Sequence, residues 1–291
     1  MAASDDQSAS FDELWDYDQA AETERRFREA LAQQPSVSAI SVELLTQIAR
    51  AQGLQRRFDA AHATLDQAAA LLRDEWPRAT VRYLLERGRV FNSSGAPTQA
   101  QPLFLEAWQR ASAADDAFYA VDAAHMLAIV APPDEQIAWN LKALAHAERA
   151  ADPRARRWLG SLYNNIGWSC HDQGQYEIAL DYFSKALTWR QAAGQEREIT
   201  IAQWAVARAL RSLGRVEHAL TMQQSLLADY ERAGEQDGYV YEEIAECALL
   251  LGQDEQAQRF FALAHGILAQ DSWLVAREPE RLERIKRLAG L

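Results

Sequence analysis

The sequence is poor in the residues that break helices and in cysteine. Its 291 residues include 13 glycines, 8 prolines and two cysteines, Cys170 and Cys247. Sparse glycine and proline favour helices over a sheet-rich fold. Two cysteines, far apart and within apolar helical patterns, are too few for the disulfide framework of a small secreted protein. We therefore expect both thiols to be free and buried.

Clusters of lysine and arginine, which nucleic-acid-binding surfaces carry, are also missing. The formal net charge is −12 and the pI is near 5.0. The short basic runs are only pairs, at Arg25-Arg26, Arg56-Arg57 and Arg156-Arg157. Because a protein that reads phosphates is normally basic over its binding domain, we expect no nucleic-acid partner.

Long apolar runs do not occur either. No window of the sequence approaches the roughly 18 apolar residues that a membrane-spanning helix needs. The N-terminal residues MAASDDQSASFDELWDYD are acidic and polar, whereas a signal peptide has a basic start and an apolar core. The sequence thus predicts a cytoplasmic protein without a membrane span.

Motifs of the common catalytic and cofactor sites are absent as well. The sequence has no glycine-rich nucleotide loop and no paired-histidine zinc motif, and its six histidines are scattered. Cys170 and His171 adjoin, but adjacent helical residues do not face each other. We expect no cofactor, no metal site and no catalytic residues. Because sites form in space rather than in sequence, an enzyme with an unrecognised site remains an alternative.

What the sequence does contain is a repeated pattern of two helices. The clearest copy starts near Gly160, with YNNIGW at 163–168, GQY at 174–176, and then Ala179, Phe183, Ala186 and Leu187. The first run predicts a helix, the Gly174 region a turn, and the last set a second helix that faces back. Gly167 and Ala179 mark the crossing of the two helices, because larger side chains would hold the backbones apart. We expect Phe183 to fill the gap toward the next repeat.

Five copies share one spacing, with a small residue on the first helix twelve positions before a small residue on the second. The pairs are Ala49 and Ala61, Gly88 and Ala100, Gly167 and Ala179, Ala207 and Ala219, and Ala245 and Ala257. A weaker copy at 118–148 has Pro132-Pro133 in place of the glycine turn. The repeats start near 42, 81, 118, 160, 200 and 238, so the period is close to 40 residues.

The copy from Gly160 resembles the tetratricopeptide repeat, whose pattern has an aromatic residue, a Leu-Gly pair, and small and aromatic residues on the second helix. The period is similar to the longer-helix variant found in kinesin light chains and in bacterial regulators of the MalT and Rap type. The resemblance covers residues 42–270 and implies an all-α fold, a right-handed superhelical solenoid of antiparallel helix pairs.

The two ends of the chain are expected to cap this array. Residues 1–41 would be an acidic segment with a degenerate half-repeat, in which Thr23 and Phe27 fit a second helix and the stretch around Phe11, Leu14 and Trp15 a poor first one. Residues 271–291 would contain a capping helix from Pro279 to Leu288, with an apolar stripe on one side.

In such arrays the first helix of each pair lines a concave groove, and the residue after the small crossing position tends to face it. That position holds Arg50, Arg89, Trp168, Arg208 and Glu246. Neighbouring groove positions add further candidate binding residues: Asn92, Asn165, His171, Trp204, Arg211, Tyr239 and Glu242. Asn165 is where peptide-binding members of the family often hold a ligand's backbone.

Each of these assignments has a structural alternative. The arginines can pair with carboxylates of a ligand through two-point hydrogen bonds, or with acids of neighbouring helices. Trp168 and Trp204 can be ligand anchors or packing residues between repeats. Asn165 can hold a ligand or bridge helices. The sequence leaves these alternatives open.

These residues predict a non-catalytic protein-protein interaction scaffold that binds a protein or peptide segment in the groove. The groove arginines suit a partner that bears carboxylates. The alternative, by resemblance to sensor-type arrays, is a ligand-responsive regulator that holds a small molecule or a signalling peptide in the same groove. The fold does not decide between them, because repeat arrays host many roles.

Overall fold

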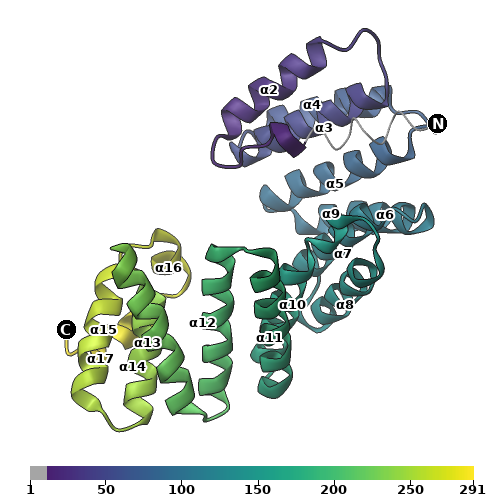
Figure 1. The fold of residues 1–291 in the computed structure, drawn as a ribbon. Coiled ribbons are helices and arrows are strands. Elements are labelled where there is room, and N and C mark those ends of the chain that lie inside the picture. The colour runs from purple at the N-terminus through teal and green to yellow at the C-terminus, as the bar shows by residue number, and fades with distance from the viewer. Residues whose placement is uncertain (1–11) are drawn as a thin grey trace. The chain divides into compact units, whose positions relative to one another are not determined.

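The computed structural model describes residues 12–291, which form helices and no strand (Figure 1). Phe11, which the sequence groups with Leu14 and Trp15, lies outside this range. The chain divides into two compact units, unit 1 at Met1–Leu162 and unit 2 at Tyr163–Leu291. Within each unit, consecutive helices pack as pairs, which confirms the all-α helix-pair fold expected from the sequence.

Unit 1 has a short 3-10 helix and a single helix, then three helix pairs and a one-turn helix. These are η1 (Asp12–Leu14), α2 (Ala20–Ala32), α3 (Ala39–Leu54) with α4 (Phe58–Leu71), α5 (Pro77–Ser93) with α6 (Pro97–Ala113), α7 (Ala117–Val130) with α8 (Pro133–Arg149), and α9 (Pro153–Arg156). The first helices of successive pairs touch, α3 with α5 and α5 with α7, so the pairs stack in a row.

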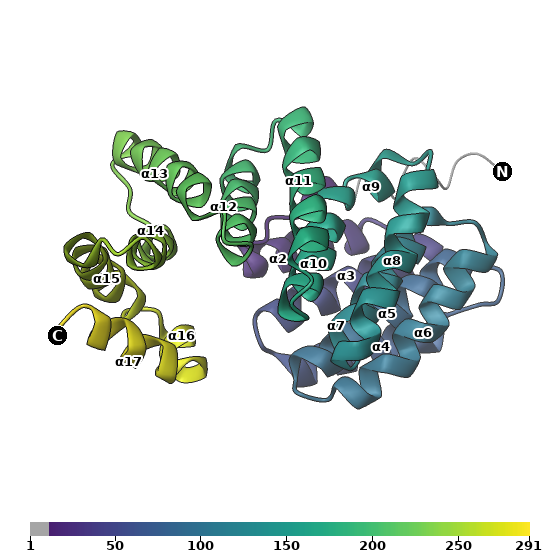
Figure 2. The ribbon, with the colours of Figure 1, turned by 90° about the horizontal axis from the view of Figure 1, so that it is seen from below.

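Unit 2 continues the pattern with three pairs and two terminal helices. These are α10 (Leu159–Asp172), whose first turn belongs to unit 1, with α11 (Tyr176–Ala193), α12 (Glu196–Ser212) with α13 (Val216–Ala233), α14 (Gly238–Leu250) with α15 (Asp254–Leu268), and then α16 (Ser272–Arg277) and α17 (Pro279–Leu288). Within this unit α12 and α14 lie on the inner side of the row, and α13 and α15 on the outer side (Figure 2).

The C-terminal helix covers the last repeat of unit 2. Helix α17 packs on α15, and its apolar residues Leu282 and Ile285 are buried. Pro279 occupies its first turn, where a missing backbone N–H costs nothing. The apolar stripe seen in the sequence therefore faces α15 rather than solvent.

The helices of a pair are held together by a large side chain of the second helix at the crossing. Phe104 and Phe183 are fully buried. A Cβ atom on Gly88 would stand 2.4 Å from Phe104 Cε1, and one on Gly167 would stand 2.5 Å from Phe183 Cε1. Because no side chain fits there, glycine lets each ring lie against the first helix. Phe183 thus packs within its own pair, a contact that the sequence interpretation did not include.

The turns between paired helices follow the expected glycine pattern with two departures. Gly174 has a φ of +73°, in the left-handed region that glycine adopts without steric cost. Arg56 holds the same place in the α3–α4 turn, with a φ of +60°. In the weaker third repeat Pro132 precedes α8, and Asn140 stands where the other repeats have alanine. Asn140 is buried, and its Oδ1 has no hydrogen-bond partner among the described residues.

Two further expectations concern the cysteines and the membrane. Cys170 and Cys247 are both free and buried, as expected. Across residues 12–291, no helix combines the length and apolar character that crossing a bilayer requires.

Candidate ligand cavities

The first helices and the C-terminal helices of unit 2 surround a cavity of about 890 Å³, here called the charged cavity. Seven of its residues are among the groove positions expected from the sequence: Trp168, Trp204, Arg208, Arg211, Tyr239, Glu242 and Glu246. The remaining side chains are Asp172, Glu243, Trp273, Glu278, Arg281 and Arg284. Residues from three successive repeats therefore meet around one space, because each occupies an inward position of a first helix.

Three aromatic rings form a continuous row along the charged cavity. The ring centroids of Trp168 and Trp204 are 5.8 Å apart, and those of Trp204 and Tyr239 are 6.4 Å apart and almost perpendicular. Trp204 Nε1 donates a hydrogen bond to the backbone oxygen of Tyr239 at 3.3 Å. Trp204 also packs on a core cluster that includes Ile244. Trp204 thus both packs between repeats and lines the cavity.

A buried carboxylate of α14 receives two arginines from α12. Arg208 Nη1 donates to Glu243 Oε1 at 2.9 Å. Arg211 donates from Nε and Nη2 to the two oxygens of Glu243, at 2.8 and 3.0 Å. Burial raises the pKa of Glu243 to about 7, although Arg211 acts in the opposite direction. Two-point arginine–carboxylate bonding fixes the geometry of both groups.

Two more carboxylates of α14 are held in the same way from α17. Arg281 donates from Nε and Nη2 to the two oxygens of Glu242, at 2.9 and 2.5 Å. Arg284 donates to both oxygens of Glu246. Arginines of α12 and α17 therefore flank a row of three glutamates on α14. The C-terminal helix contributes side chains to the cavity as well as covering α15.

The two kinds of charge differ in their exposure to solvent. The side chains of Glu243 and Glu242 are 5% and 8% exposed, whereas those of Arg208 and Arg284 are 31% and 42% exposed. Two further carboxylates of the lining, those of Asp172 and Glu278, are 78% and 37% exposed. A molecule entering the cavity therefore meets the donors of Arg208 and Arg284, the aromatic rings and these two acids before it meets Glu242 and Glu243.

A smaller space of about 250 Å³, here called the apolar pocket, adjoins the charged cavity. Its lining consists of Thr200, Ile201, Trp204, Tyr230, Asp237, Tyr239 and Val240. Asp237 caps α14, and its Oδ1 accepts hydrogen bonds from the backbone N–H groups of Tyr239 and Val240 at 2.8 and 3.0 Å. Burial, and then the charge and hydrogen bond of Asp237, raise the pKa of Tyr230 to about 12. Trp204 and Tyr239 line both spaces.

The other two groove arginines lie in unit 1, where they share one carboxylate. Arg50 Nη1 and Arg89 Nη1 donate to Glu86 Oε1 at 3.2 and 2.6 Å. Arg89 also donates to Asp122 of α7. Arg50 and Arg89 line a small cavity of about 180 Å³. Each of the four groove arginines thus pairs with an acid on the next first helix, which is the structural alternative that the sequence left open.

The N-terminal segment lies against one of these arginines. The guanidinium carbon of Arg50 is 5.6 Å from the ring centroid of Trp15 and 5.8 Å from that of Tyr17. The two aromatic rings stack on each other, and Trp15 Nε1 donates to Gln47 Oε1 at 3.0 Å. The chain itself therefore covers part of the surface around Arg50.

The two groove asparagines are not brought into these spaces. Asn92 on α5 and Asn165 on α10 are half-buried and line neither the charged cavity nor the small cavity around Arg50. A ligand-binding role for Asn92 and Asn165 stays a prediction.

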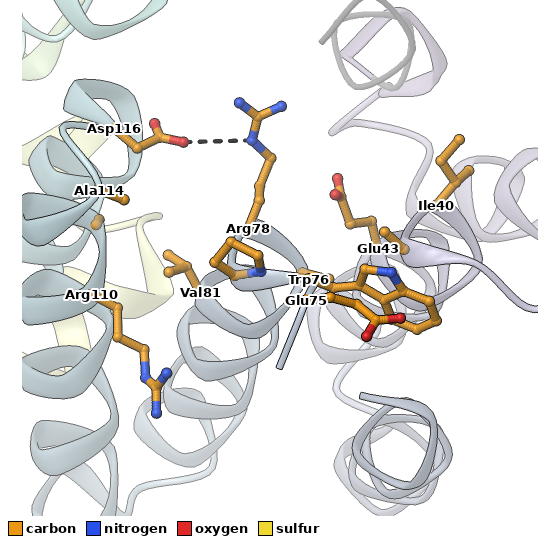
Figure 3. A pocket seen from close by; sticks show the side chains of 13 residues that line it. Ile40, Glu43, Glu75, Trp76, Arg78, Val81, Arg110, Ala114 and Asp116 are labelled. Atoms are coloured by element: carbon orange, nitrogen blue, oxygen red, sulfur yellow. Dashed lines mark ion pairs between the residues drawn. The ribbon is translucent and has the colours of Figure 1, made fainter. Parts of the chain in front are cut away.

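Another concavity in unit 1 lies at the helix ends, away from the groove positions. It has a volume of about 350 Å³ and is formed by the starts of α3 and α5 and the end of α6. Figure 3 shows Arg78 reaching toward Asp116, with 3.5 Å between Nε and Oδ2, and Trp76 and Glu43 among the other lining side chains. Glu43 is buried and already paired with Arg82 at 2.9 Å. No groove pattern in the sequence pointed to this concavity.

The described part of the chain offers no obvious metal site. Within residues 12–291, no group of three or more His, Cys, Asp or Glu side chains is arranged to hold a metal ion.

The family comparison identifies the repeat. The family profile of the tetratricopeptide repeat matches residues 160–192, which span α10 and α11. The chain carries a tetratricopeptide repeat. A search of curated protein sequences found no significant match.

Solved tetratricopeptide-repeat structures share the fold over most of the chain. The apo form of RapI matches with a TM-score of 0.76 and 12% identity, over 98% of this chain and 79% of RapI. A signal-transduction ATPase with a tetratricopeptide-repeat sensor, from Pyrococcus horikoshii, matches with a TM-score of 0.70 and 14% identity, over 91% of this chain and 41% of the ATPase.

A quorum sensor provides a third likeness, in two states. The apo form of NprR from B. thuringiensis matches with a TM-score of 0.67 and 16% identity, over 97% of this chain and 81% of NprR. NprR in complex with its cognate peptide NprX matches with a TM-score of 0.54 and 15% identity, over 99% and 84% of the two chains. These TM-scores show a common fold, and they confirm the expected likeness to Rap-type repeat arrays.

Several residues of the charged cavity lie outside the set expected from the sequence. Arg281 and Arg284 were assigned to a capping helix, and Trp273 to no element. A signal for the arginines exists in the repeat register, because Arg208 and Glu243 are 35 residues apart and Arg281 and Glu242 are 39 apart. Both separations are close to one tetratricopeptide-repeat period. Searching for opposite charges one period apart would therefore have found these pairs.

Proposed function

We propose that this chain is a non-catalytic interaction module that binds a peptide or protein segment in the charged cavity of unit 2. The observation that carries the proposal is the joint lining of one cavity by the aromatic row and by exposed arginines. Tryptophan, tyrosine and arginine are the residues that dominate binding energy at protein interfaces. The cavity, of about 890 Å³, has room for several residues of a peptide.

The rim of the cavity supports the same role. Trp273 on α16 is 58% exposed, although a side chain of this size is costly to leave in water. Exposed large apolar side chains beside a concave site often mark a binding surface. The complex of NprR with NprX supports the proposal by analogy of fold, since that repeat protein binds a peptide.

The charge arrangement favours a partner that bears carboxylates. The guanidinium groups of Arg208 and Arg284 are more exposed than the glutamates that they bond, so both can offer N–H donors to a partner. Arginine recognises planar carboxylates through two parallel hydrogen bonds. This preference arises although the whole chain has a net charge of −12.

A selection from a random peptide library tests the proposal directly. The full chain is immobilised, displayed linear peptides are enriched over several rounds, and recovered peptides are synthesised and measured by fluorescence anisotropy. Trp273→Ala should weaken binding by about 10-fold, because it removes an exposed ring that lines the cavity. Trp273 is exposed, so its removal should leave the fold intact.

The matched control is Leu250→Ala. Leu250 is a 59% exposed apolar residue of the same unit and does not line the charged cavity. It should leave peptide affinity unchanged. Failure to enrich any peptide, or equal affinities of the wild type and the Trp273→Ala variant, would remove the charged cavity as the binding site.

A ligand-responsive sensor is the second candidate function. The volume of the charged cavity falls within the range of about 300–1,000 Å³ that is typical of small-molecule sites. A metabolite that binds only the folded chain raises its melting temperature in proportion to occupancy. A shift caused by one compound, and abolished by Trp273→Ala, would favour the sensor over the peptide-binding module.

A further inference from the structure

We infer that the apolar pocket and the charged cavity are two subsites of one site, which takes a peptide with a carboxylate side chain within two positions of a large apolar side chain. The inference rests on the proposed function and adds the chemistry of the ligand. The aromatic or branched aliphatic side chain enters the apolar pocket, and the carboxylate binds the exposed guanidinium groups.

A shared wall joins the two subsites. Trp204 and Tyr239 line both spaces, and their ring centroids are 6.4 Å apart. The hydrogen bond from Trp204 Nε1 to the backbone oxygen of Tyr239 holds the wall in place. A ligand that touches both faces of this wall occupies both spaces at once.

Three polar side chains of the apolar pocket, those of Thr200, Asp237 and Tyr230, already interact within the chain. Thr200 Oγ1 donates to the backbone oxygen of Glu196 at 3.3 Å. Asp237 accepts the two backbone N–H groups that begin α14, and its carboxylate also interacts with Tyr230. A polar side chain entering the pocket would lose its water without compensation, whereas an apolar one gains by leaving water. Ile201, 48% exposed, is positioned to cover such a side chain.

The charged subsite retains hydrogen-bonding capacity that points to an anion. Arg208 donates to Glu243 through Nη1, and no hydrogen bond of its Nε or Nη2 is seen among the described residues. Arg211 uses Nε and Nη2 for Glu243 and keeps Nη1. Arginine has donors but no acceptor, so these groups call for an acceptor on the ligand. A carboxylate supplies two acceptor oxygens and a charge that complements the guanidinium groups.

The geometry of an extended peptide sets the spacing of the two side chains. Each residue advances the chain by roughly 3.3 Å, so residues two apart place their side chains on one face at a separation near 7 Å. Neighbouring residues place theirs on opposite faces. The 6.4 Å between the two rings of the wall is therefore matched best by side chains two positions apart.

Peptides recovered from the library selection provide the probe. We expect the enriched sequences to share Asp or Glu within two positions of Leu, Ile, Phe, Tyr or Trp. In synthetic copies, replacing the acid by its amide should weaken binding by about 10-fold or more, because a charge-assisted hydrogen bond is lost. Replacing the apolar residue of the peptide by alanine should weaken binding by at least about 10-fold, because less apolar surface is buried.

Two protein variants, each with a matched control, locate the subsites. Ile201→Glu places a charge at the apolar pocket, and Ile178→Glu makes the same change at a residue of equal exposure, 48%, that lines neither space. Arg208→Gln removes the exposed donor, and Glu243 keeps Arg211 as a partner. Arg215→Gln removes a cation that is paired with Glu177 away from both spaces. The two site variants should weaken binding by about 10-fold, and the controls should not.

A thermodynamic cycle decides whether the carboxylate meets Arg208. Replacing the acid of the peptide by its amide should weaken binding to the Arg208→Gln variant much less than it weakens binding to the wild type. Equal costs in both proteins would place the acid elsewhere and overturn the charged subsite. Equal affinities of Ile201→Glu and Ile178→Glu would overturn the apolar subsite.

These outcomes are distinct from failure of the proposed function. Peptides that bind in a Trp273-dependent manner but share no acid and apolar pair would leave the interaction module in place and remove the two-subsite inference. A selection that enriches no peptide would remove both.

Discussion

Arg208 on α12 and Glu243 on α14 are joined across one repeat, with 2.9 Å between Nη1 and Oε1. The same relationship recurs in unit 1, where Arg50 on α3 reaches Glu86 on α5 and Arg89 on α5 reaches Asp122 on α7. Inward positions of successive first helices thus carry an arginine on one helix and an acid on the next. These pairs link neighbouring repeats, and in unit 2 they also shape the charged cavity.

Arg89 should be a residue on which stability depends strongly. Its side chain is 15% exposed and pairs with Glu86 and Asp122, whose side chains are 5% and 8% exposed. Arg89→Gln would leave the buried Asp122 without its cation and Glu86 with Arg50 alone, at a cost of about 3–5 kcal/mol. Urea unfolding followed by circular dichroism measures the change. Arg110→Gln, which breaks an exposed pair with Glu106, should cost no more than about 1 kcal/mol. Equal costs would contradict the structural role of Arg89.

The pH dependence of stability should reveal Glu243. Its pKa in the folded chain is raised to about 7 from an ordinary value of 4.5, because burial disfavours the charged form. The folded state therefore binds this proton more tightly than the unfolded state. The contribution of Glu243 to the unfolding free energy is fully present below about pH 4.5. It is lost as pH rises through 7, by at most about 1.4 kcal/mol per pH unit.

A difference measurement isolates this contribution. Buried histidines such as His125, whose pKa is lowered by burial, have the opposite effect as pH falls below 6.5. The other charged groups around Glu243 are the arginines of α12 and α17 and the neighbouring Glu242 and Glu246. The unfolding free energy of the wild type minus that of Glu243→Gln should decrease between pH 5.5 and 8.5. A constant difference would show that the carboxyl is ionised throughout.

Gln223 should be a stabilising site for substitution. It is fully buried in α13, and neither Nε2 nor Oε1 has a hydrogen-bond partner among the described residues. Leu65 and Leu144 hold the matching places of two other repeats, sixteen residues after the small residue of the first helix. Gln223→Leu should raise the unfolding free energy by about 1–3 kcal/mol, because an unsatisfied buried amide is removed.

The same substitution at Gln52 should lower the unfolding free energy instead of raising it. Gln52 is equally buried, but its amide donates to Glu24 Oε1 at 3.1 Å and accepts from Thr64 Oγ1 at 2.9 Å. Gln52→Leu would remove the acceptor of Thr64 Oγ1 and one of the hydrogen bonds of Glu24, which keeps Arg28, Gln55 and Arg57. It should therefore destabilise the chain. Stabilisation by both substitutions would mean that burial alone, rather than hydrogen bonding, decides the outcome.

The repeat architecture could be predicted from small side chains, because their spacing reflects a local steric need. Gly88 and Gly167 stand where a Cβ would overlap a phenylalanine ring, so the sequence there records the crossing of two helices. Pro279 likewise marks the start of α17 through its own backbone chemistry. Such signals do not depend on distant parts of the chain, and they fix the helix bounds closely.

The cavities were harder to predict, because they depend on which charges meet. The sequence placed Arg208 in the groove but could not show that Glu243 lies beneath it, since side-chain pairing depends on the rotation of each helix. Arg281 and Arg284 looked like the polar side of a cap, and their second role appears when α17 is placed against α15. The division into two units, at Leu162 and Tyr163, falls inside α10 and has no break in sequence pattern.

Arg56 should be a strained position that glycine relieves. Its φ of +60° places a residue with a Cβ in the left-handed region, where Gly174 and its counterparts stand in other repeats. Arg56→Gly should stabilise the chain by about 0.5–1 kcal/mol, after the greater flexibility of glycine in the unfolded chain is subtracted. Gly174→Arg, the reverse exchange at the matching turn, should destabilise it. Thermal unfolding should show a higher melting temperature for Arg56→Gly and a lower one for Gly174→Arg than for the wild type.

Hydrogen exchange of the full chain, with and without a saturating library-selected peptide, tests the central claim most directly. When the ligand peptide is bound in the charged cavity, the backbone amides of α12, α14 and α17 should exchange more slowly, because Arg208, Tyr239 and Arg281 lie on these helices. Exchange in α4 and α6 of unit 1 should be unchanged. Protection confined to unit 1, or no protection at saturation, would contradict the account.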